Sequence, residues 1–158
     1  MLWFGIETMY KGKNNEVYGD IEESLLACLL INPNLMSELK VEEKHFTKYG
    51  YIFTFFKEFY AKHRNLDITL MFSIVKSSSE MVLMDAITYL LEIFVIPTHF
   101  QEYQDKLIEK YCANKKEEWL RKKIYEKATK LYVGSINLET FNFEIKKLYN
   151  QAEKIDWK

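Results

Sequence analysis

The sequence has few of the residues that break or cross-link a chain. Its 158 residues include five glycines, two prolines and two cysteines. So few turn-forming residues argue against a fold built from many short strands. Cys28 and Cys112 form no CxxC pair, and two cysteines predict no disulfide framework. We therefore expect an all-α protein from a reducing, cytoplasmic setting.

Charge and hydropathy argue against two further classes of protein. The formal net charge is −1, so no global attraction draws the chain to nucleic acid or to an anionic membrane. The most apolar run, residues 87–96, is shorter than the roughly 20 residues of a membrane span and contains Glu92. We interpret this run as a buried helix and expect no membrane partner.

The sequence also lacks recognisable patterns for catalysis, cofactors and metals. It contains no G-x-x-x-x-G-K-[ST] loop for phosphates. His45, His63 and His99 are far apart, and neither cysteine lies at ligand spacing from one of them. No serine or cysteine is placed as an obvious nucleophile. We predict that this chain is not an enzyme and has no catalytic, cofactor-binding or metal site.

Residues 18–112 have the apolar spacing of a compact helical head of about five to six helices. Residues 1–17, which include the polar cluster Lys11-Gly12-Lys13-Asn14-Asn15, predict a flexible N-terminal arm. The strongest apolar stripe of the head consists of Ile52, Phe53, Phe56, Phe59 and Tyr60. This stripe fits either a buried core or a platform for stacked bases. Because no basic residues are interleaved on its face, we favour the core, with Phe46 as a further anchor.

Two prolines mark predicted helix boundaries in the head. Pro33 is expected to open a short helix that Asn32 caps. Pro97 is expected to end a helix over residues 80–94, whose predicted inward positions are Leu83, Ala86, Ile87, Leu90 and Leu91.

The second half of the chain predicts a helical hairpin over residues 98–155 that shares residues 98–112 with the head. Its first arm, residues 98–131, would span roughly 50 Å as one helix, which is too long for the head, so its far half is expected to protrude. Gly134 suits a left-handed helix end and Asn137 suits the next N-cap. The return helix is expected to face the first arm through Leu138, Phe141, Ile145, Leu148, Tyr149 and Ala152.

Two sets of residues in the hairpin are candidates for contacts with other molecules. The candidates for a partner or oligomer interface are Trp119, Tyr125, Leu131, Tyr132, Phe141 and Leu148. The candidates for nucleic-acid contacts are Lys115, Lys116, Arg121, Lys122, Lys123 and Lys127. The basic set fits either phosphate contacts or the charged, solvated face of a projecting helix, and we favour the solvated face.

Several short motifs occur in an order and spacing that resemble a known family. The first is EESLLACLLINP at residues 22–33. The others are Phe46, Ile52-Phe53, Leu66-Asp67, Tyr89-Leu90, Pro97-Thr98, and Tyr103 with Leu107, Ile108, Glu109 and Lys110. Over residues 18–155 the sequence resembles the N-terminal domain of the DnaB-type replicative hexameric helicases.

The resemblance implies a helical head with a hairpin, in a domain that forms a collar and to which primase docks. It therefore implies a non-catalytic DNA-replication module that self-associates through the hairpin and docks a primase, a replicative helicase or a helicase loader. Two alternatives stay open, namely a nucleic-acid-binding accessory factor that uses the basic residues 115–130, and a phage or plasmid antagonist that mimics the collar. If the chain continued beyond residue 158, the whole protein would be an ATP-dependent DNA helicase.

Overall fold

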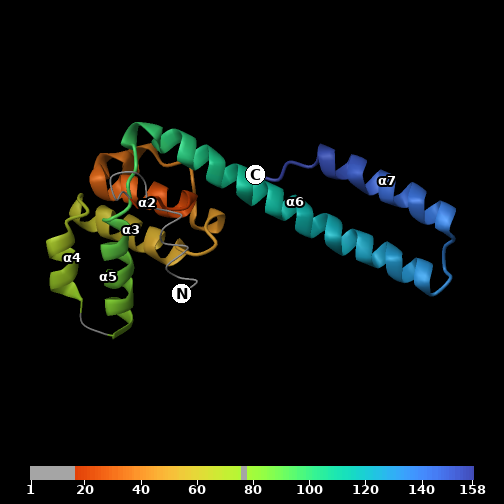
Figure 1. Cartoon of the computed structure of the whole chain (residues 1–158), viewed down its shortest axis with the longest axis horizontal. Coiled ribbons are helices and arrows are strands. Elements are labelled where there is room, and N and C mark those ends of the chain that lie inside the picture. Colours follow the sequence, from red (N-terminus) through yellow and green to blue (C-terminus); the bar gives the residue numbers. More distant parts are fainter. Residues whose placement is uncertain (1–16, 76–77) are drawn as a thin grey trace. The chain divides into compact units, whose positions relative to one another are not determined.

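The computed structural model describes residues 17–75 and 78–158, and every regular element of this part of the chain is a helix (Figure 1). The all-α prediction is confirmed. Apart from Val17, the predicted N-terminal arm lies outside the described residues. The chain divides into two compact units, Met1–Leu107 and Ile108–Lys158, and each is described by itself.

The first unit is built around α2 (Ile21–Ile31). Asp20 and Glu23 form a reciprocal capping box at its start, because each side chain accepts a hydrogen bond of 2.9 Å from the backbone N–H of the other residue. Its buried apolar residues are consecutive rather than spaced along one face: Leu25, Leu26, Ala27, Cys28 and Leu29. A helix that is apolar all round belongs at the centre of its unit.

The predicted short helix after Asn32 is a 3-10 helix, η1 (Pro33–Glu38), rather than an α-helix. Asn32 does cap it, accepting a hydrogen bond from the Asn34 N–H at 3.3 Å. Leu39 then adopts extended backbone angles and ends the segment before it can form two α-helical turns.

The aromatic stripe lies on α3 (Gly50–His63) and its members Ile52, Phe53, Phe56 and Phe59 are buried. Phe46, which follows the short 3-10 helix η2 (Glu43–His45), is also buried and stacks on Phe53 with ring centroids 4.6 Å apart. Each fully buried ring contributes about 1.5–3 kcal/mol relative to exposure. The core interpretation is confirmed for these residues, whereas Tyr60, the fifth member of the predicted stripe, is half-buried.

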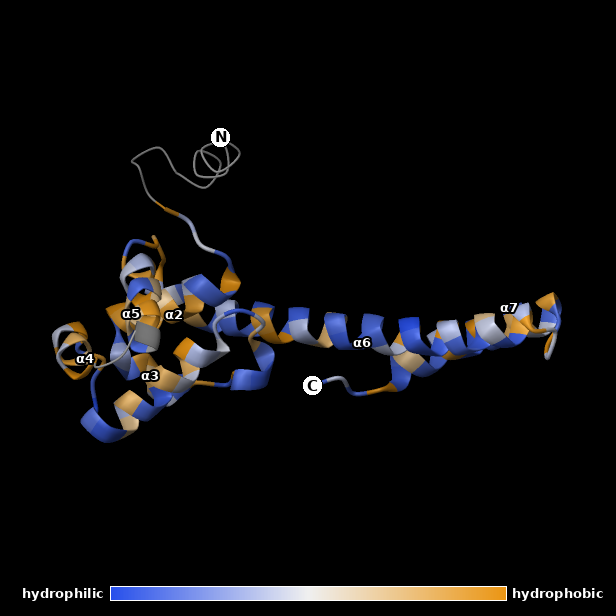
Figure 2. Ribbon diagram, turned by 90° about the horizontal axis from the view of Figure 1, so that it is seen from below, coloured by the Kyte–Doolittle hydropathy of each residue, from blue (hydrophilic) through white to orange (hydrophobic). Residues whose placement is uncertain are grey.

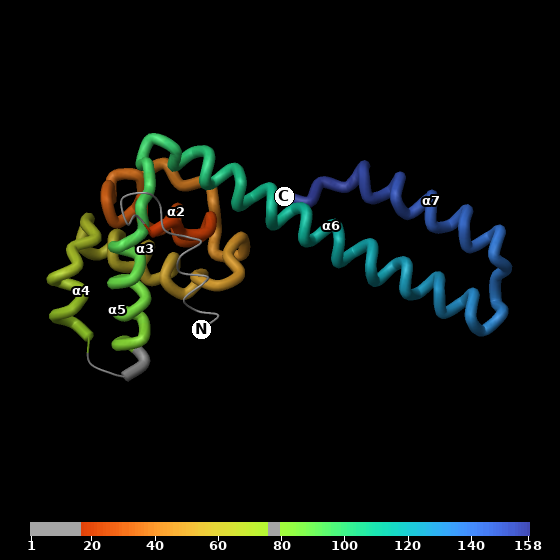
Figure 3. Tube along the Cα trace, viewed as in Figure 1, coloured from red at the N-terminus to blue at the C-terminus, as the bar shows by residue number. Residues whose placement is uncertain are grey.

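Two further helices, α4 (Ile68–Ile74) and α5 (Ser78–Leu90), follow α3 in the first unit (Figure 3). Asp67 caps α4 through the Leu70 N–H at 3.2 Å. The prediction of a helix to residue 94 is wrong, because α5 ends at Leu90 in a tight turn closed by the Glu92 N–H on the Tyr89 carbonyl at 3.0 Å. Leu91, predicted to point inward, is half exposed.

Beyond α5 the chain is extended, so residues 87–96 are not one buried helix. Ile93 forms an isolated parallel bridge with Val17, and the Phe94 N–H donates to the Val17 carbonyl at 2.6 Å. Ile93 and Val95 are buried while Phe94 and Ile96 are exposed, which is the two-residue alternation of an extended chain. Pro97 opens a 3-10 turn, η3 (Pro97–His99), that leads into α6 (Phe100–Tyr132).

The first turns of α6 belong to the first unit and are fixed by Gln104, which is fully buried. Its Oε1 accepts hydrogen bonds from the backbone N–H groups of Lys40 at 2.6 Å and Val41 at 3.3 Å. Its Nε2 donates to the Glu38 carbonyl at 3.1 Å. One side chain therefore satisfies three backbone groups of the segment that follows η1.

In the second unit the rest of α6 runs antiparallel to α7 (Leu138–Lys154) (Figure 1). α6 is one uninterrupted α-helix from Phe100 to Tyr132. Gly134 ends α6 with a φ of 81°, donating to the Leu131 carbonyl at 3.1 Å, while the Ser135 N–H reaches the Lys130 carbonyl at 2.9 Å. This is a Schellman motif. Asn137 caps α7 through the Thr140 N–H at 2.8 Å, as predicted. No described helix is long and apolar enough to cross a membrane.

Candidate interaction surface

The two helices of the hairpin meet along a narrow apolar strip. Leu148 and Ala152 of α7 are buried, and their neighbours are half-buried: Leu120, Ile124, Leu131, Phe141 and Ile145. Leu138 and Tyr149, which were predicted to face the first arm, are exposed. That prediction is wrong because α7 packs on one neighbouring helix in this unit, so it buries a narrower face than a helix in a full bundle.

A pair of tryptophans closes the open end of the hairpin. The rings of Trp119 on α6 and Trp157 after α7 meet edge to face, with centroids 5.8 Å apart. The Trp157 Nε1–H donates to the Ala152 carbonyl at 3.1 Å, which satisfies one of the last carbonyls of α7. The chain after α7 therefore returns to the α6 surface and packs on Trp119.

Four of the six basic candidates in the hairpin are paired with carboxylates. Lys116 pairs with Glu153 and Lys127 with Glu144 across the two helices, the latter at 3.8 Å. Arg121 with Glu117 at 2.8 Å and Lys122 with Glu118 at 3.3 Å form pairs one turn apart on α6. Lys115 lies over the Tyr111 ring at 5.4 Å. The basic residues thus lie in a mixed-charge face rather than a row of unopposed cations.

The structure divides the six interface candidates into two groups. Trp119, Leu131 and Phe141 are half-buried and Leu148 is buried, so these four contribute to the packing of the hairpin itself. Tyr125 and Tyr132 are 74% and 91% exposed. Because they lie seven residues apart on α6, they share one face of that helix.

Sequence reasoning missed other exposed apolar side chains of the second unit. Phe143 on α7 is 66% exposed, and Val133, which follows the last residue of α6, is also exposed. In Figure 2 the turn between α6 and α7 contains hydrophobic residues, drawn in orange, whereas most of the hairpin ribbon is blue to white. Phe143 could have been found from its position, since it lies two residues from Phe141 and cannot share its face of the helix.

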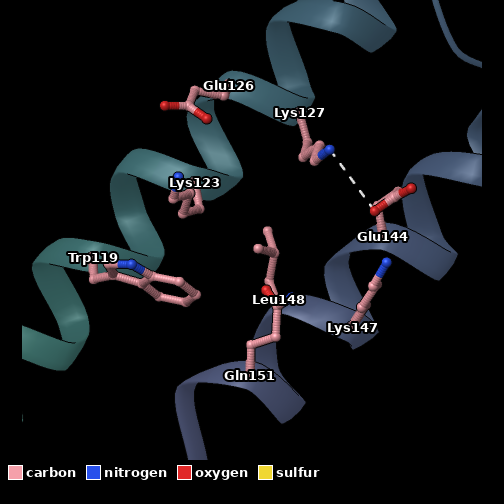
Figure 4. Close-up of a pocket in the computed structure, with 8 residues that line it drawn as sticks. All are labelled: Trp119, Lys123, Glu126, Lys127, Glu144, Lys147, Leu148 and Gln151. Carbon is pink, nitrogen blue, oxygen red and sulfur yellow. Dashed lines mark ion pairs between the residues drawn. The ribbon is translucent and has the colours of Figure 1, made fainter. Parts of the chain in front are cut away.

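A pocket of about 380 Å³ opens between α6 and α7 (Figure 4). Its lining includes Trp119, Lys123 and Lys127 from α6 and Lys147 and Leu148 from α7. In Figure 4 the Trp119 indole and the Leu148 side chain extend into the space between the two helices, and the lysines surround it. The pocket therefore combines an apolar wall with a basic rim.

Among the described residues, the titratable groups with clearly shifted pKa values lie in the first unit. Burial raises the pKa of the Cys28 thiol to about 12, so this cysteine stays protonated and packs as a small apolar residue. Burial and the hydrogen bond that its hydroxyl donates to Glu23 at 2.8 Å raise the pKa of Tyr49. Neither residue has the depressed pKa of an activated nucleophile or acid. Within the described residues, no group of three or more His, Cys, Asp or Glu could hold a metal ion.

Comparison with protein-family models shows to which family the chain belongs. The model of the DnaB-like helicase N-terminal domain matches residues 14–109, more than half of the chain. The chain belongs to the DnaB-like helicase N-terminal domain family. Searches of curated proteins and of solved structures gave no match.

The match of the DnaB-like helicase N-terminal domain covers α2 to α5 and the first turns of α6. Several motifs that carry the resemblance are part of its core, since Leu25, Phe46, Ile52, Leu66 and Leu90 are all buried. The chain is therefore a helicase-associated replication module, and the matched domain is a non-catalytic one. The hairpin beyond residue 109 lies outside the match.

Proposed function

We propose that this DnaB-like N-terminal domain protein self-associates through its hairpin and serves as a docking module for a primase, a replicative helicase or a helicase loader. The observation that carries the proposal is the exposure of Tyr125 and Tyr132 on one face of α6. Large exposed apolar side chains that gather on one surface are typical of protein interfaces, and tyrosine is enriched in them.

The packing of the hairpin supports the same conclusion. Its two helices bury only a narrow strip between them, while Phe143, Val133 in the turn and Leu138 at the start of α7 stay exposed. A helical pair with little buried surface is marginal by itself, and a second copy of the hairpin would cover these side chains. Family membership adds that relatives of this domain oligomerise and interact with replication proteins.

The charge pattern favours a protein partner over nucleic acid. Four of the six basic candidates already have a carboxylate partner. Nucleic-acid affinity grows with the number of phosphates that free cations neutralise, so a face of paired charges would bind DNA weakly. Nucleic-acid contacts by Lys115 to Lys127 stay a prediction that a titration with single-stranded DNA at low salt would test.

Size-exclusion chromatography with light scattering tests the self-association. The proposal predicts a molar mass at tens of micromolar that is a multiple of the 19.0 kDa chain. A mass that stays at one chain over that whole concentration range would contradict it.

A further inference from the structure

The pocket between α6 and α7 has a prearranged apolar wall. Trp119 forms one side, and its ring is held by the edge-to-face contact with Trp157. Trp157 is in turn fixed by its hydrogen bond to the Ala152 carbonyl. Leu148 of α7 forms the opposite side. A rigid indole facing an aliphatic side chain fits one apolar side chain of a partner at small entropic cost, because little has to be ordered on binding.

Two of the three lysines at the rim of the pocket form no ion pair with the described part of the chain. Lys127 pairs with Glu144, but no carboxylate of the described residues lies within 4.0 Å of the Nζ of Lys123 or Lys147. Lys123 comes from α6 and Lys147 from α7, so the two ammonium groups flank the apolar wall from both helices (Figure 4). Glu126 is the remaining acidic residue of the lining, which leaves a net charge of +1.

The same sign of charge extends over the whole second unit. Residues 108–158 contain 12 lysines and arginines against eight acidic residues, whereas residues 1–107 contain 10 against 15. The second unit therefore has a net charge of +4 and the first a net charge of −5. A positive field around the pocket steers acidic partners toward it and lowers the affinity of basic ones.

From this combination we propose that the pocket binds a short acidic peptide segment of the docking partner, in which one apolar side chain is flanked by carboxylates. This inference rests on the proposed docking function and names the chemistry of the partner. The apolar side chain lies between Trp119 and Leu148, and its flanking carboxylates pair with Lys123 and Lys147. A peptide fits better than nucleic acid because Glu126 and Glu144 at the rim repel a continuous row of phosphates, whereas a peptide can place its carboxylates beside the lysines alone.

Selection from a random peptide library on the full chain tests the proposal without knowledge of the natural partner. Displayed peptides of about 12 residues can form roughly three helical turns. The expected outcome is enrichment of peptides with a large apolar residue and an Asp or Glu within four positions of it. No enrichment, or enrichment of basic or uncharged peptides, would overturn the proposal.

Two double variants then locate the binding of an enriched peptide. Lys123→Glu with Lys147→Glu reverses both free cations of the pocket, and we expect fluorescence anisotropy to show binding weakened about tenfold or more. The matched control, Lys130→Glu with Lys146→Glu, changes the net charge equally at exposed positions outside the lining, and its affinity should stay within about threefold of the original. Equal weakening by both variants would show a general charge effect and refute the pocket as the site.

Binding of an oligothymidylate probe tests whether the pocket binds nucleic acid instead of a peptide. If it binds at moderate salt and loses that binding in the Lys123 and Lys147 variant while no acidic peptide is selected, the pocket is a nucleic-acid site and the peptide proposal fails. Light scattering on the same variant shows whether a loss of peptide binding is accompanied by a loss of self-association. A multimeric variant that no longer binds peptide leaves self-association intact, and a monomeric original chain that still selects acidic peptides leaves the pocket intact.

Discussion

Glu22 on α2 receives two hydrogen bonds from Thr47, one from its hydroxyl at 2.6 Å and one from its backbone N–H at 3.1 Å. The backbone N–H groups of Lys48 and Tyr49 donate to the other carboxylate oxygen, each at 3.0 Å. One buried carboxylate thus satisfies three successive N–H groups just before α3, whose own N-cap residue, Tyr49, supplies no side-chain cap. Glu22 joins the central helix of the first unit to the start of its aromatic helix.

Replacing Glu22 by glutamine tests that link. The amide of Glu22→Gln has one oxygen acceptor and turns an NH₂ donor toward N–H groups, so at least one donor would lose its partner. Losing charge-assisted hydrogen bonds and leaving a buried donor unpaired should lower the free energy of unfolding by about 2–3 kcal/mol in urea denaturation. The control Glu58→Gln changes an exposed glutamate of α3 and should have an effect within about 0.5 kcal/mol. Similar losses in the two variants would refute a special role for Glu22.

The contributions of Glu22 and His45 to the free energy of unfolding should be lost in different pH ranges. Burial would raise the pKa of Glu22, but hydrogen bonds from Thr47, Tyr49 and Lys48 outweigh it and lower that pKa below about 4.5. Burial, with a smaller contribution from Lys44, lowers the pKa of His45 below about 6.5. In both cases the unfolded chain binds the proton more readily than the folded one, so stability falls as pH falls.

The contribution of His45 to stability is therefore lost first, as pH drops below the ordinary pKa of a histidine. The contribution of Glu22 is lost only as pH falls through its lowered pKa. Urea denaturation between roughly pH 7 and pH 3 should show both phases. Glu22→Gln should remove the lower phase and leave the upper one in place. A Glu22→Gln variant that keeps the full loss of stability in the lower window would show that other carboxylates cause it.

Substitution of Gln104 should lower stability at least as much as substitution of Glu22. Gln104→Ala removes the partner of the Lys40 and Val41 N–H groups and of the Glu38 carbonyl, and it leaves a cavity where the side chain was fully buried. We expect unfolding to require about 2–4 kcal/mol less free energy, measured by urea denaturation. Asn114→Ala, an exposed polar position on the same helix, is the control and should stay within about 0.5 kcal/mol. A small effect of Gln104→Ala would mean that water replaces the amide.

The turn of the hairpin gives a prediction that depends on backbone strain alone. A Cβ at Gly134 would meet nothing within 4 Å, but the φ of 81° is unfavourable for alanine. Gly134→Ala should therefore destabilise the hairpin by about 1 kcal/mol, seen as faster amide exchange at the end of α6 and the start of α7. Ser135→Ala, which keeps the same backbone hydrogen bonds, is the matched control. Unchanged exchange in Gly134→Ala would show that the turn relaxes without cost.

The sequence predicted well those features that depend on neighbours within one helix or one turn. The 3.6-residue period located α3 and α6, and Gly134 and Asn137 marked the hairpin turn, because capping residues act on groups three to five positions away. The extended segment after Leu90 was missed although Ile93 and Val95 show a two-residue period. An apolar run of this length fits a helix and a strand equally well, and the deciding partner, Val17, lies far away in sequence.

The contacts of the candidate surface and of the buried polar groups were less predictable. Glu22 accepts hydrogen bonds from residues at least 25 positions away, and Gln104 from residues more than 60 positions away, so neither role leaves a local signal. In the hairpin, periodicity identifies apolar positions but cannot say which of them the second helix covers. Leu148 and Tyr125 were equal candidates, yet Leu148 is buried against α6 and Tyr125 is exposed.

The central claim, that the exposed tyrosine face of the hairpin mediates self-association, is tested most directly by light scattering on Tyr125→Ser with Tyr132→Ser. The control Tyr51→Ser replaces an exposed tyrosine of the first unit. The account predicts that the original chain and the control are multimeric. It predicts that the concentration below which the multimer dissociates is about tenfold or more higher for the double variant than for the original chain. A double variant with the same concentration-dependent mass as the original chain would contradict it.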